Sequence, residues 1–165
     1  MLGAAGEPRA AAGALEAVAR QHLERREADE VLVVVRDAAT LFRRAADRCG
    51  EGRMVQVLAE MHLTRGEANQ ALEVAEKALT IFRELGCKSE EASALHMMAK
   101  TYLEKGDFAK AVRNAREAQG LFGQLGWSQQ SAAARLTAAE VHLAMRRRHE
   151  ALIEAKEVSA VSRRS

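Results

Sequence analysis

Residues 91–126 read EASALHMMAKTYLEKGDFAKAVRNAREAQGLFGQLG, and this stretch decides the fold class. Apolar side chains in its first part recur at i, i+3, i+4, i+7 and i+8, the spacing of one face of an α-helix: Leu95, Met98, Ala99, Tyr102 and Leu103. Gly106 suits the left-handed residue that ends a helix, and Asp107 suits the N-cap of the next one. A second helical stripe follows, at Phe108, Ala111, Val112, Ala115, Ala118, Leu121, Phe122 and Leu125. The stretch therefore predicts two helices joined by a tight turn.

The same constellation recurs along the chain with a period of 40 residues. The matching sets are Phe42, Phe82 and Phe122; Ala59, Ala99 and Ala139; His62, Tyr102 and His142; Leu63, Leu103 and Leu143; Ala71, Ala111 and Ala151; and Ala75, Ala115 and Ala155. Such a period is typical of a solenoid, in which each repeat buries its apolar face against its neighbours. We therefore expect an all-α fold of about four antiparallel helix hairpins, with repeats at 11–50, 51–90, 91–130 and 131–165 after a flexible segment at 1–10. The fourth hairpin should hold helices at about 130–145 and 149–161.

The composition is that of packed helices without a dominant charge. Of the 165 residues, 48% are hydrophobic and 4% are aromatic, and 25 basic residues nearly balance 23 acidic ones. Small and unbranched apolar residues favour helices over strands, and the mixed charge gives no reason to expect nucleic acid as a partner. The longest aliphatic run, Val31–Val35, is far shorter than the roughly 20 residues that span a bilayer. We therefore expect no membrane insertion.

Two cysteines, Cys49 and Cys87, lie without the close Cys or His spacing of a metal site. We expect free thiols, which fit a reducing compartment. The sequence therefore favours a soluble intracellular protein, most simply a cytoplasmic one. An organelle is the alternative, in which case the Ala- and Gly-rich start at 1–14 would be the remnant of a targeting segment.

Within a hairpin the pattern is large–x2–large–small–x2–aromatic, then Gly-Asp or Gly-Glu, then alanines four and three apart. This pattern resembles the tetratricopeptide repeat, and two stretches match it position by position: Leu95, Met98, Ala99, Tyr102, Gly106, Ala111, Ala115 and Ala118; and Val55, Leu58, Ala59, His62, Gly66, Ala71, Ala75 and Ala78. The usual repeat has about 34 residues, so the longer period is similar to that of kinesin light chain and related adaptors. The resemblance covers about residues 11–163 and implies a right-handed superhelical solenoid that binds proteins.

The resemblance also implies that the first helix of each hairpin lines a concave groove. Its outward positions, with neighbouring leucines, are the candidate contacts to a peptide or helix of a partner protein: Arg53, Gln56, Glu60, Ser93, His96, Lys100, Leu103, Glu104, Ala133, Leu136, Glu140 and Leu143. The family's lysine and asparagine clamp for a terminal carboxylate is not reproduced at these positions. The first hypothesis is therefore a noncatalytic interaction module or scaffold with another kind of ligand. The alternative is a structural subunit of a large multiprotein assembly that docks through its convex face or its uncapped ends.

No arrangement of residues predicts catalysis, a cofactor or a metal site. His22, His62 and His142 occupy the aromatic position of the repeat, so we expect them to pack in or near the core. The one dense basic cluster is Arg146, Arg147 and Arg148, which would contact phosphate or an acidic partner. The simpler alternative is that these cations favour the helix dipole and stay in water. RNA binding by the helical surface is kept as a minor hypothesis.

Overall fold

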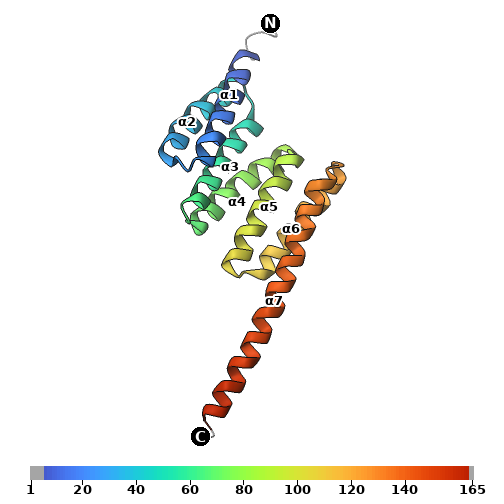
Figure 1. Cartoon of the computed structure of the whole chain (residues 1–165). Coiled ribbons are helices and arrows are strands. Elements are labelled where there is room, and N and C mark those ends of the chain that lie inside the picture. The colour runs from blue at the N-terminus through green and yellow to red at the C-terminus, as the bar shows by residue number, and fades with distance from the viewer. Residues whose placement is uncertain (1–5, 164–165) are drawn as a thin grey trace. The chain divides into compact units, whose positions relative to one another are not determined.

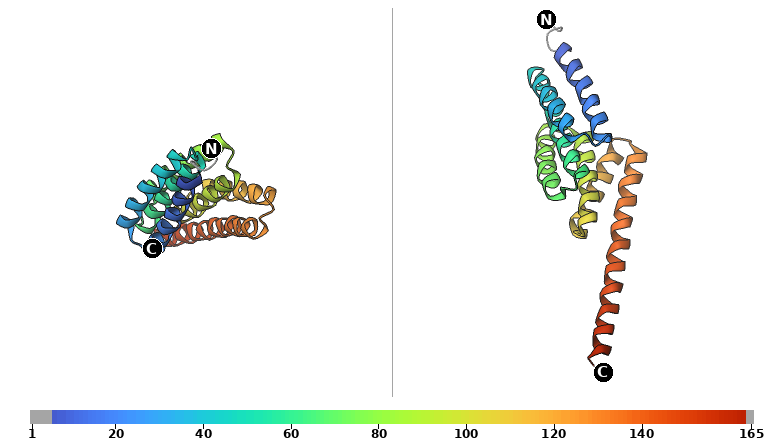
Figure 2. Two further views of the ribbon diagram at one scale, coloured as in Figure 1. Left: turned by 90° about the horizontal axis from the view of Figure 1, so that it is seen from above. Right: turned by 60° about the vertical axis from the view of Figure 1, so that its left-hand side comes forward.

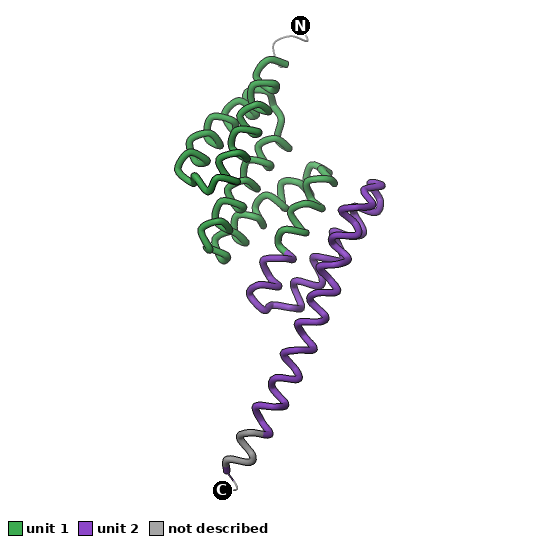
Figure 3. Tube along the Cα trace, viewed as in Figure 1, with its two compact units in different colours: residues 1–98 green, residues 99–165 purple. Residues whose placement is uncertain are grey.

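The computed structural model describes residues 6–163, except the side chains of residues 158–162. Seven helices and no strand occur in this range (Figure 1): α1 (Gly6–Glu24), α2 (Ala28–Arg44), α3 (Arg48–Thr64), α4 (Ala68–Leu85), α5 (Lys88–Lys105), α6 (Phe108–Gln124) and α7 (Ser128–Ser162). The chain forms two compact units, unit 1 at Met1–Met98 and unit 2 at Ala99–Ser165, which divide within α5 (Figure 3). The predicted all-α class is confirmed. Helix α1 begins five residues before its predicted start, and residues 1–5 lie outside the described range.

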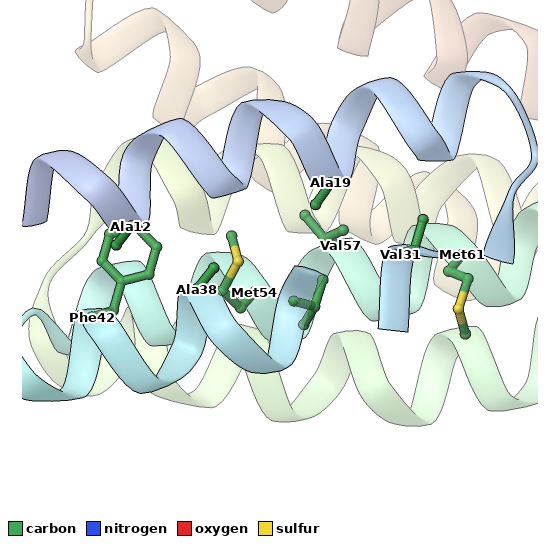
Figure 4. Close-up of a cluster of buried hydrophobic side chains, with 9 residues drawn as sticks. Ala12, Ala19, Val31, Ala38, Phe42, Met54, Val57 and Met61 are labelled. Carbon is green, nitrogen blue, oxygen red and sulfur yellow. The ribbon is translucent and has the colours of Figure 1, made fainter. Parts of the chain in front are cut away.

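Unit 1 is built from two helical hairpins, α1 with α2 and α3 with α4, together with the first part of α5, and α2 also packs on α3. Its buried side chains include small residues from α1 and larger ones from α2 and α3 (Figure 4): Ala12, Ala19, Val31, Ala38, Phe42, Met54, Val57 and Met61. Gly50 of α3 lies against the Phe42 ring, and a Cβ atom at this position would overlap the ring carbons. The close approach of α2 and α3 therefore depends on a residue without a side chain.

The turn chemistry predicted from the repeat is present in the third hairpin. Gly106 adopts a left-handed φ of 77°, and Asp107 caps α6 by accepting a backbone hydrogen bond from its first turn. Arg26 takes the same role in the first repeat with a φ of 61°. A turn of this kind can therefore form without glycine.

A contact between histidine and glutamate braces the turn in the first two repeats. His22 Nδ1 lies 2.6 Å from Glu27 Oε2, and His62 Nδ1 lies 2.6 Å from Glu67 Oε2. The histidine comes from the end of the first helix, and the glutamate directly precedes the second helix. Because the two histidine side chains are 24% and 23% exposed, they pack at the edge of the core while they hold the turn.

Unit 2 consists of the end of α5 together with α6 and α7, and α6 packs along α7. Ala99, Ala115 and Ala138 form its buried cluster, one residue from each helix, and Val112 packs beside them. Small side chains at this crossing let the three helices approach closely. This is the packing that the repeat pattern predicts for the third hairpin.

The predicted fourth hairpin is wrong, because α7 runs as a single helix of 35 residues (Figure 2). Arg146 and Arg147 stand one period after Gly106 and Asp107, so neither a glycine nor an acidic N-cap interrupts the helix. Arg146 Nε instead lies 2.9 Å from Glu150 Oε1, across the predicted turn. An i,i+4 ion pair of this kind favours a continuous helix.

Two further differences from the earlier repeats remove the packing site for a second helix in the fourth repeat. Arg135, which is exposed, stands one period after Leu95, which is 1% exposed. His142 is followed five residues later by Arg147, so the histidine–glutamate brace cannot form there. A returning helix would have to pack on a charged surface without a braced turn.

The prediction of free thiols is also wrong, because Cys49 and Cys87 form a disulfide. Cys49 lies at the start of α3, and Cys87 directly precedes α5. Their Cα atoms are 6.5 Å apart, within the range that a disulfide spans. The spacing of 38 residues is close to one period, and a separation of about one period brings the starts of successive first helices together. Spacing rules for metal sites could not reveal this, and the thiols no longer support a reducing compartment.

Candidate protein-binding groove

A groove of about 300 Å³ lies within unit 2, between the end of α5 and the first half of α7. Side chains three and four residues apart form each wall, because such residues share one face of a helix. The lining residues are Lys100, Leu103 and Glu104 of α5 and Ala133, Leu136, Thr137 and Glu140 of α7. All except Thr137 belong to the outward positions and leucines predicted as ligand contacts.

The floor of the groove is apolar and open to solvent. Leu136 of this floor is 61% exposed. Leu143, two turns further along α7, is 49% exposed but does not line the groove. Thr137 is buried and donates a hydrogen bond from Oγ1 to the carbonyl oxygen of Ala133 at 3.2 Å, which leaves no hydroxyl pointing across the leucines. The groove can therefore receive an aliphatic or aromatic side chain without desolvating a polar group of its own.

Charged groups at the rim of this groove are free to meet a ligand. No other residue of the described part of the chain forms a salt bridge with Lys100, Glu104 or Glu140. Lys100 and Glu104 come from α5, and Glu140 comes from α7. One positive and two negative charges therefore surround an exposed leucine.

The predicted contacts in unit 1 are engaged with one another and with α1. Arg53 Nε lies 3.0 Å from Glu16 Oε2, and Arg20 Nη1 lies 3.3 Å from Glu60 Oε2. Gln56, which is 7% exposed, donates from Nε2 to Glu60 Oε1 at 3.1 Å. These side chains form an internal polar network, so a ligand would have to displace existing ion pairs to use them.

Comparison with known proteins agrees with this architecture. Residues 53–122 match the family model described as tetratricopeptide repeat. Residues 53–122 therefore contain tetratricopeptide repeats. No curated protein matches the sequence as a relative.

A solved structure with similar repeats is a crystal structure of nearly identical TPR-like repeats from a Podospora anserina protein described as a kinesin light chain. It is 14% identical to this chain, and the match covers 96% of this chain and 98% of the other. The TM-score is 0.41, which is too low to establish a shared arrangement of the repeats.

The remaining predicted groove residues lie in unit 1. Ser93 donates from Oγ to the carbonyl oxygen of Ser89 at 2.9 Å, and His96 follows one turn later on α5. Unit 1 holds Arg53, Gln56, Glu60, Ser93 and His96, whereas unit 2 holds Lys100, Leu103, Leu136, Glu140 and Leu143. The structure therefore brings Lys100, Leu103, Leu136 and Glu140 together in one groove, whereas Leu143 does not line it.

The predicted basic cluster of α7 is exposed but partly engaged. Arg146 pairs with Glu150, and the Arg148 guanidinium lies 5.8 Å from the centre of the Phe108 ring. This cation–π contact fixes Arg148 against the start of α6. Arg146 and Arg148 therefore make contacts within the protein. Because α7 continues through residues 146–148, the cluster does not lie at a helix end, and the predicted interaction with a helix dipole is wrong.

The network residues Glu16 and Arg20 were missed by reasoning from outward positions alone. A signal for them exists in the repeat, because the charge alternates in sign at positions 20, 60, 100 and 140: Arg20, Glu60, Lys100 and Glu140. The first two are the ion pair in unit 1. The last two face the groove in unit 2.

One buried carboxylate lies outside the groove. Glu91, 4% exposed, accepts hydrogen bonds from Lys88 Nζ at 2.8 Å and Arg83 Nε at 3.1 Å. Burial raises the pKa of Glu91, but the two cations outweigh it and hold the pKa below its usual range. A perturbed pKa can mark a functional site, yet these contacts join the end of α4 to the start of α5 and therefore serve the fold.

No group of His, Cys, Asp and Glu side chains within the described residues is arranged to hold a metal ion. His142, the third histidine at the aromatic position, is exposed, and its Nε2 lies 3.4 Å from Arg116 Nη2. None of the helices over residues 6–163 is both long and apolar enough to cross a bilayer.

Proposed function

We propose that this chain is a noncatalytic module that binds a peptide or helix of a partner protein in the groove between α5 and α7. Tetratricopeptide repeats in general mediate interactions between proteins. The observation that carries the proposal is Leu136, which is 61% exposed and lies beside Lys100, Glu104 and Glu140. An exposed apolar side chain surrounded by unpaired charges supplies both contact area and orientation to a ligand.

The groove indicates the chemistry of the bound segment. Leu103 and Leu136 suit an aliphatic or aromatic side chain as the buried anchor. Lys100 suits an acidic residue on one side of this anchor, and Glu104 with Glu140 suits a basic residue on the other side. We expect most of the affinity to come from the anchor and the orientation to come from the charges.

The experiment starts with a pull-down from native extract and identification of the bound proteins by mass spectrometry. The affinity of a bound partner is then measured for the wild type, for Leu136→Asp and for Lys100→Glu. The control is Val33→Asp, because Val33 is 60% exposed, as much as Leu136, but lies on α2 in unit 1. We expect Leu136→Asp to weaken binding at least about tenfold, a loss of about 1.4 kcal/mol, and Val33→Asp to leave it unchanged. Full affinity in Leu136→Asp would contradict the groove as the binding site.

A second candidate function is that of a structural subunit in a large assembly. The observation that favours it is the far half of α7, where Leu152 is 53% exposed and Ile153 is 44% exposed. Partners that survive Leu136→Asp but are lost in Leu152→Asp would support docking through this end of the helix. The same pull-down therefore separates the two functions.

Localisation and catalysis are parts of the proposal that stay predictions. A cytoplasmic site is the simplest for an adaptor, but the Cys49–Cys87 disulfide is more usual in oxidising compartments. Fractionation with thiol labelling in intact cells tests the location and the state of the disulfide at once. A location in the secretory pathway would contradict the cytoplasmic prediction.

A further inference from the structure

The far half of α7, residues 149–157, carries the alanine pattern of the second helix of a hairpin, but these alanines are not packed against another helix. Ala151 and Ala155 stand one period after Ala111 and Ala115. In the third repeat the earlier two are 0% exposed, and Ala115 packs with Ala99 of the preceding helix. In α7 both later alanines are exposed.

The matching surface on the first half of α7 is also uncovered. Ala139 stands one period after Ala99 and two after Ala59, both of which are 0% exposed, yet Ala139 itself is exposed. Leu143, which follows on the same face, is 49% exposed. In the other hairpins these two alanine positions lie on two helices that pack against each other. In α7 both positions lie on one straight helix, which keeps Ala139 and Ala155 apart.

We infer that a second copy of this chain closes the contact, so that residues 149–157 of one copy pack against the Ala139 face of α7 in another. The occupant is indicated by the repeat itself, because residues 149–157 correspond to the segment that covers the equivalent face in the third repeat. Ala139 does not line the groove. The inference is therefore independent of the proposed groove, and it gives the far half of α7 a different partner from that of the second candidate function.

The charges of the two halves favour this pairing. Residues 128–148 hold four arginines against Glu140, a net charge of +3, whereas residues 149–157 hold three glutamates against Lys156, a net charge of −2. A far half therefore attracts a first half, while two first halves or two far halves repel each other. The pairing is between unlike surfaces.

The rotation of the helix makes the association open rather than closed. Ala139 and Ala155 are 16 residues apart, and at about 100° per residue they point about 160° away from each other. Two straight helices lying side by side in a closed pair would need both alanines on the same side. Each copy therefore uses its first half for one neighbour and its far half for another, a head-to-tail contact that can continue beyond two copies.

Sedimentation equilibrium of the full chain tests the stoichiometry. The chain has a mass of 18.0 kDa, and we expect the average mass of the wild type to rise past that of two copies as its concentration approaches about 1 mM. Ala139→Arg blocks the first-half surface and Ala155→Arg blocks the far-half surface. Because both alanines are exposed in the single copy, neither change should unfold it, which circular dichroism checks.

The two variants together give the decisive result. Each alone should stay monomeric, but their equal mixture retains one working contact and should form a one-to-one pair that goes no further. A wild type that stays monomeric, a wild type that stops at two copies, a single variant that assembles like the wild type, or a mixture that stays monomeric would each overturn the inference.

Cross-linking identifies the surfaces in contact. In the chain with Ala139→Cys and Ala155→Cys, oxidation should join different copies into a ladder on a non-reducing gel, and either cysteine alone should give no ladder. A disulfide formed mainly within one copy would show that α7 folds back on itself, and would overturn the inference.

Discussion

Ala99 and Ala139 are the same residue at the same repeat position, but their surroundings differ. Ala99 is 0% exposed and packs with Ala115 and Ala138, whereas Ala139 is exposed. We expect Ala99→Arg to lower the free energy of unfolding by at least about 3 kcal/mol, because a charge would enter a close helix crossing without a partner. Urea denaturation followed by circular dichroism measures this loss.

The matched control is Ala139→Arg, measured at a concentration low enough to prevent association. We expect a change within about 0.5 kcal/mol, as is usual for an exposed position. Equal losses in both variants would mean that a helix covers Ala139 within one copy. An unchanged denaturation curve for Ala99→Arg would mean that the repeat register is wrong.

The depressed pKa of Glu91 predicts a pH dependence of stability. Since the folded-state pKa lies below the ordinary value of 4.5, the stabilisation by Glu91 is present above about pH 4.5 and is lost as the pH falls through the folded-state pKa. We expect Glu91→Gln to cost about 1.5–3 kcal/mol at pH 7, the usual contribution of hydrogen bonds to a charged group, and much less at pH 2–3. Urea denaturation of both proteins across this range measures the difference.

The control for this pH profile is Glu104→Gln, which changes an exposed glutamate without a salt bridge to the other described residues. Its effect should be small at every pH. A Glu91→Gln penalty that persists undiminished at low pH would show that packing of the side chain, and not its charge, stabilises the junction of α4 and α5.

At the scale of the helix, the continuity of α7 depends on the side chains at three positions. Replacing them by their counterparts from the third repeat gives Arg135→Leu with Arg146→Gly and Arg147→Asp. We expect this triple variant to fold back into a fourth hairpin. It regains an apolar packing position at 135, a residue that favours the left-handed conformation at 146 and an N-cap at 147. Residues 139 and 155, about 24 Å apart along a continuous helix, would then become neighbours.

Cysteines at positions 139 and 155 report this closure. In the triple variant they should cross-link within one chain, and self-association should disappear. Arg135→Leu alone serves as the control and should keep the helix straight. Cross-linking between chains in the triple variant would show that the turn residues do not decide the conformation.

Most helices could be predicted from the sequence because each turn carries its own local chemistry. Gly106 and Asp107 end one helix and start the next without help from distant residues. The error in α7 came from extending the period past a point where its physical basis had ended. Arg135 and Arg147 could have indicated this from the sequence. A charged side chain at the packing position and a missing N-cap both oppose a hairpin.

At the scale of the whole chain, the Cys49–Cys87 disulfide connects two successive repeats of unit 1. We expect the double variant Cys49→Ser with Cys87→Ser to lose about 3–4 kcal/mol, because a bridge spanning 38 residues restricts the unfolded chain. Denaturation with and without reducing agent measures the loss. Reduction should destabilise the wild type and leave the double variant unchanged, and a wild type insensitive to reduction would contradict the disulfide.

The groove could be predicted only in part. Lys100 and Leu136 follow from helix register, because outward positions of successive first helices face the same side. The pairing of Arg53 with Glu16 could not be foreseen by treating each helix alone, since it depends on the side chain that the neighbouring helix offers. The cysteine bridge escaped prediction for the same reason.

The alternation of charge at positions 20, 60, 100 and 140 has a consequence for how the chain folds. Nearly identical repeats can misdock by skipping a neighbour, a characteristic failure of repeat proteins. Here the next repeat along the chain always offers the opposite charge, while the one after it offers the same charge. Arg20 meets Glu60 in the folded protein, but it would meet Lys100 if a repeat were skipped. The alternation therefore favours docking of each repeat on its neighbour in sequence, because like charges would meet and repel if a repeat were skipped.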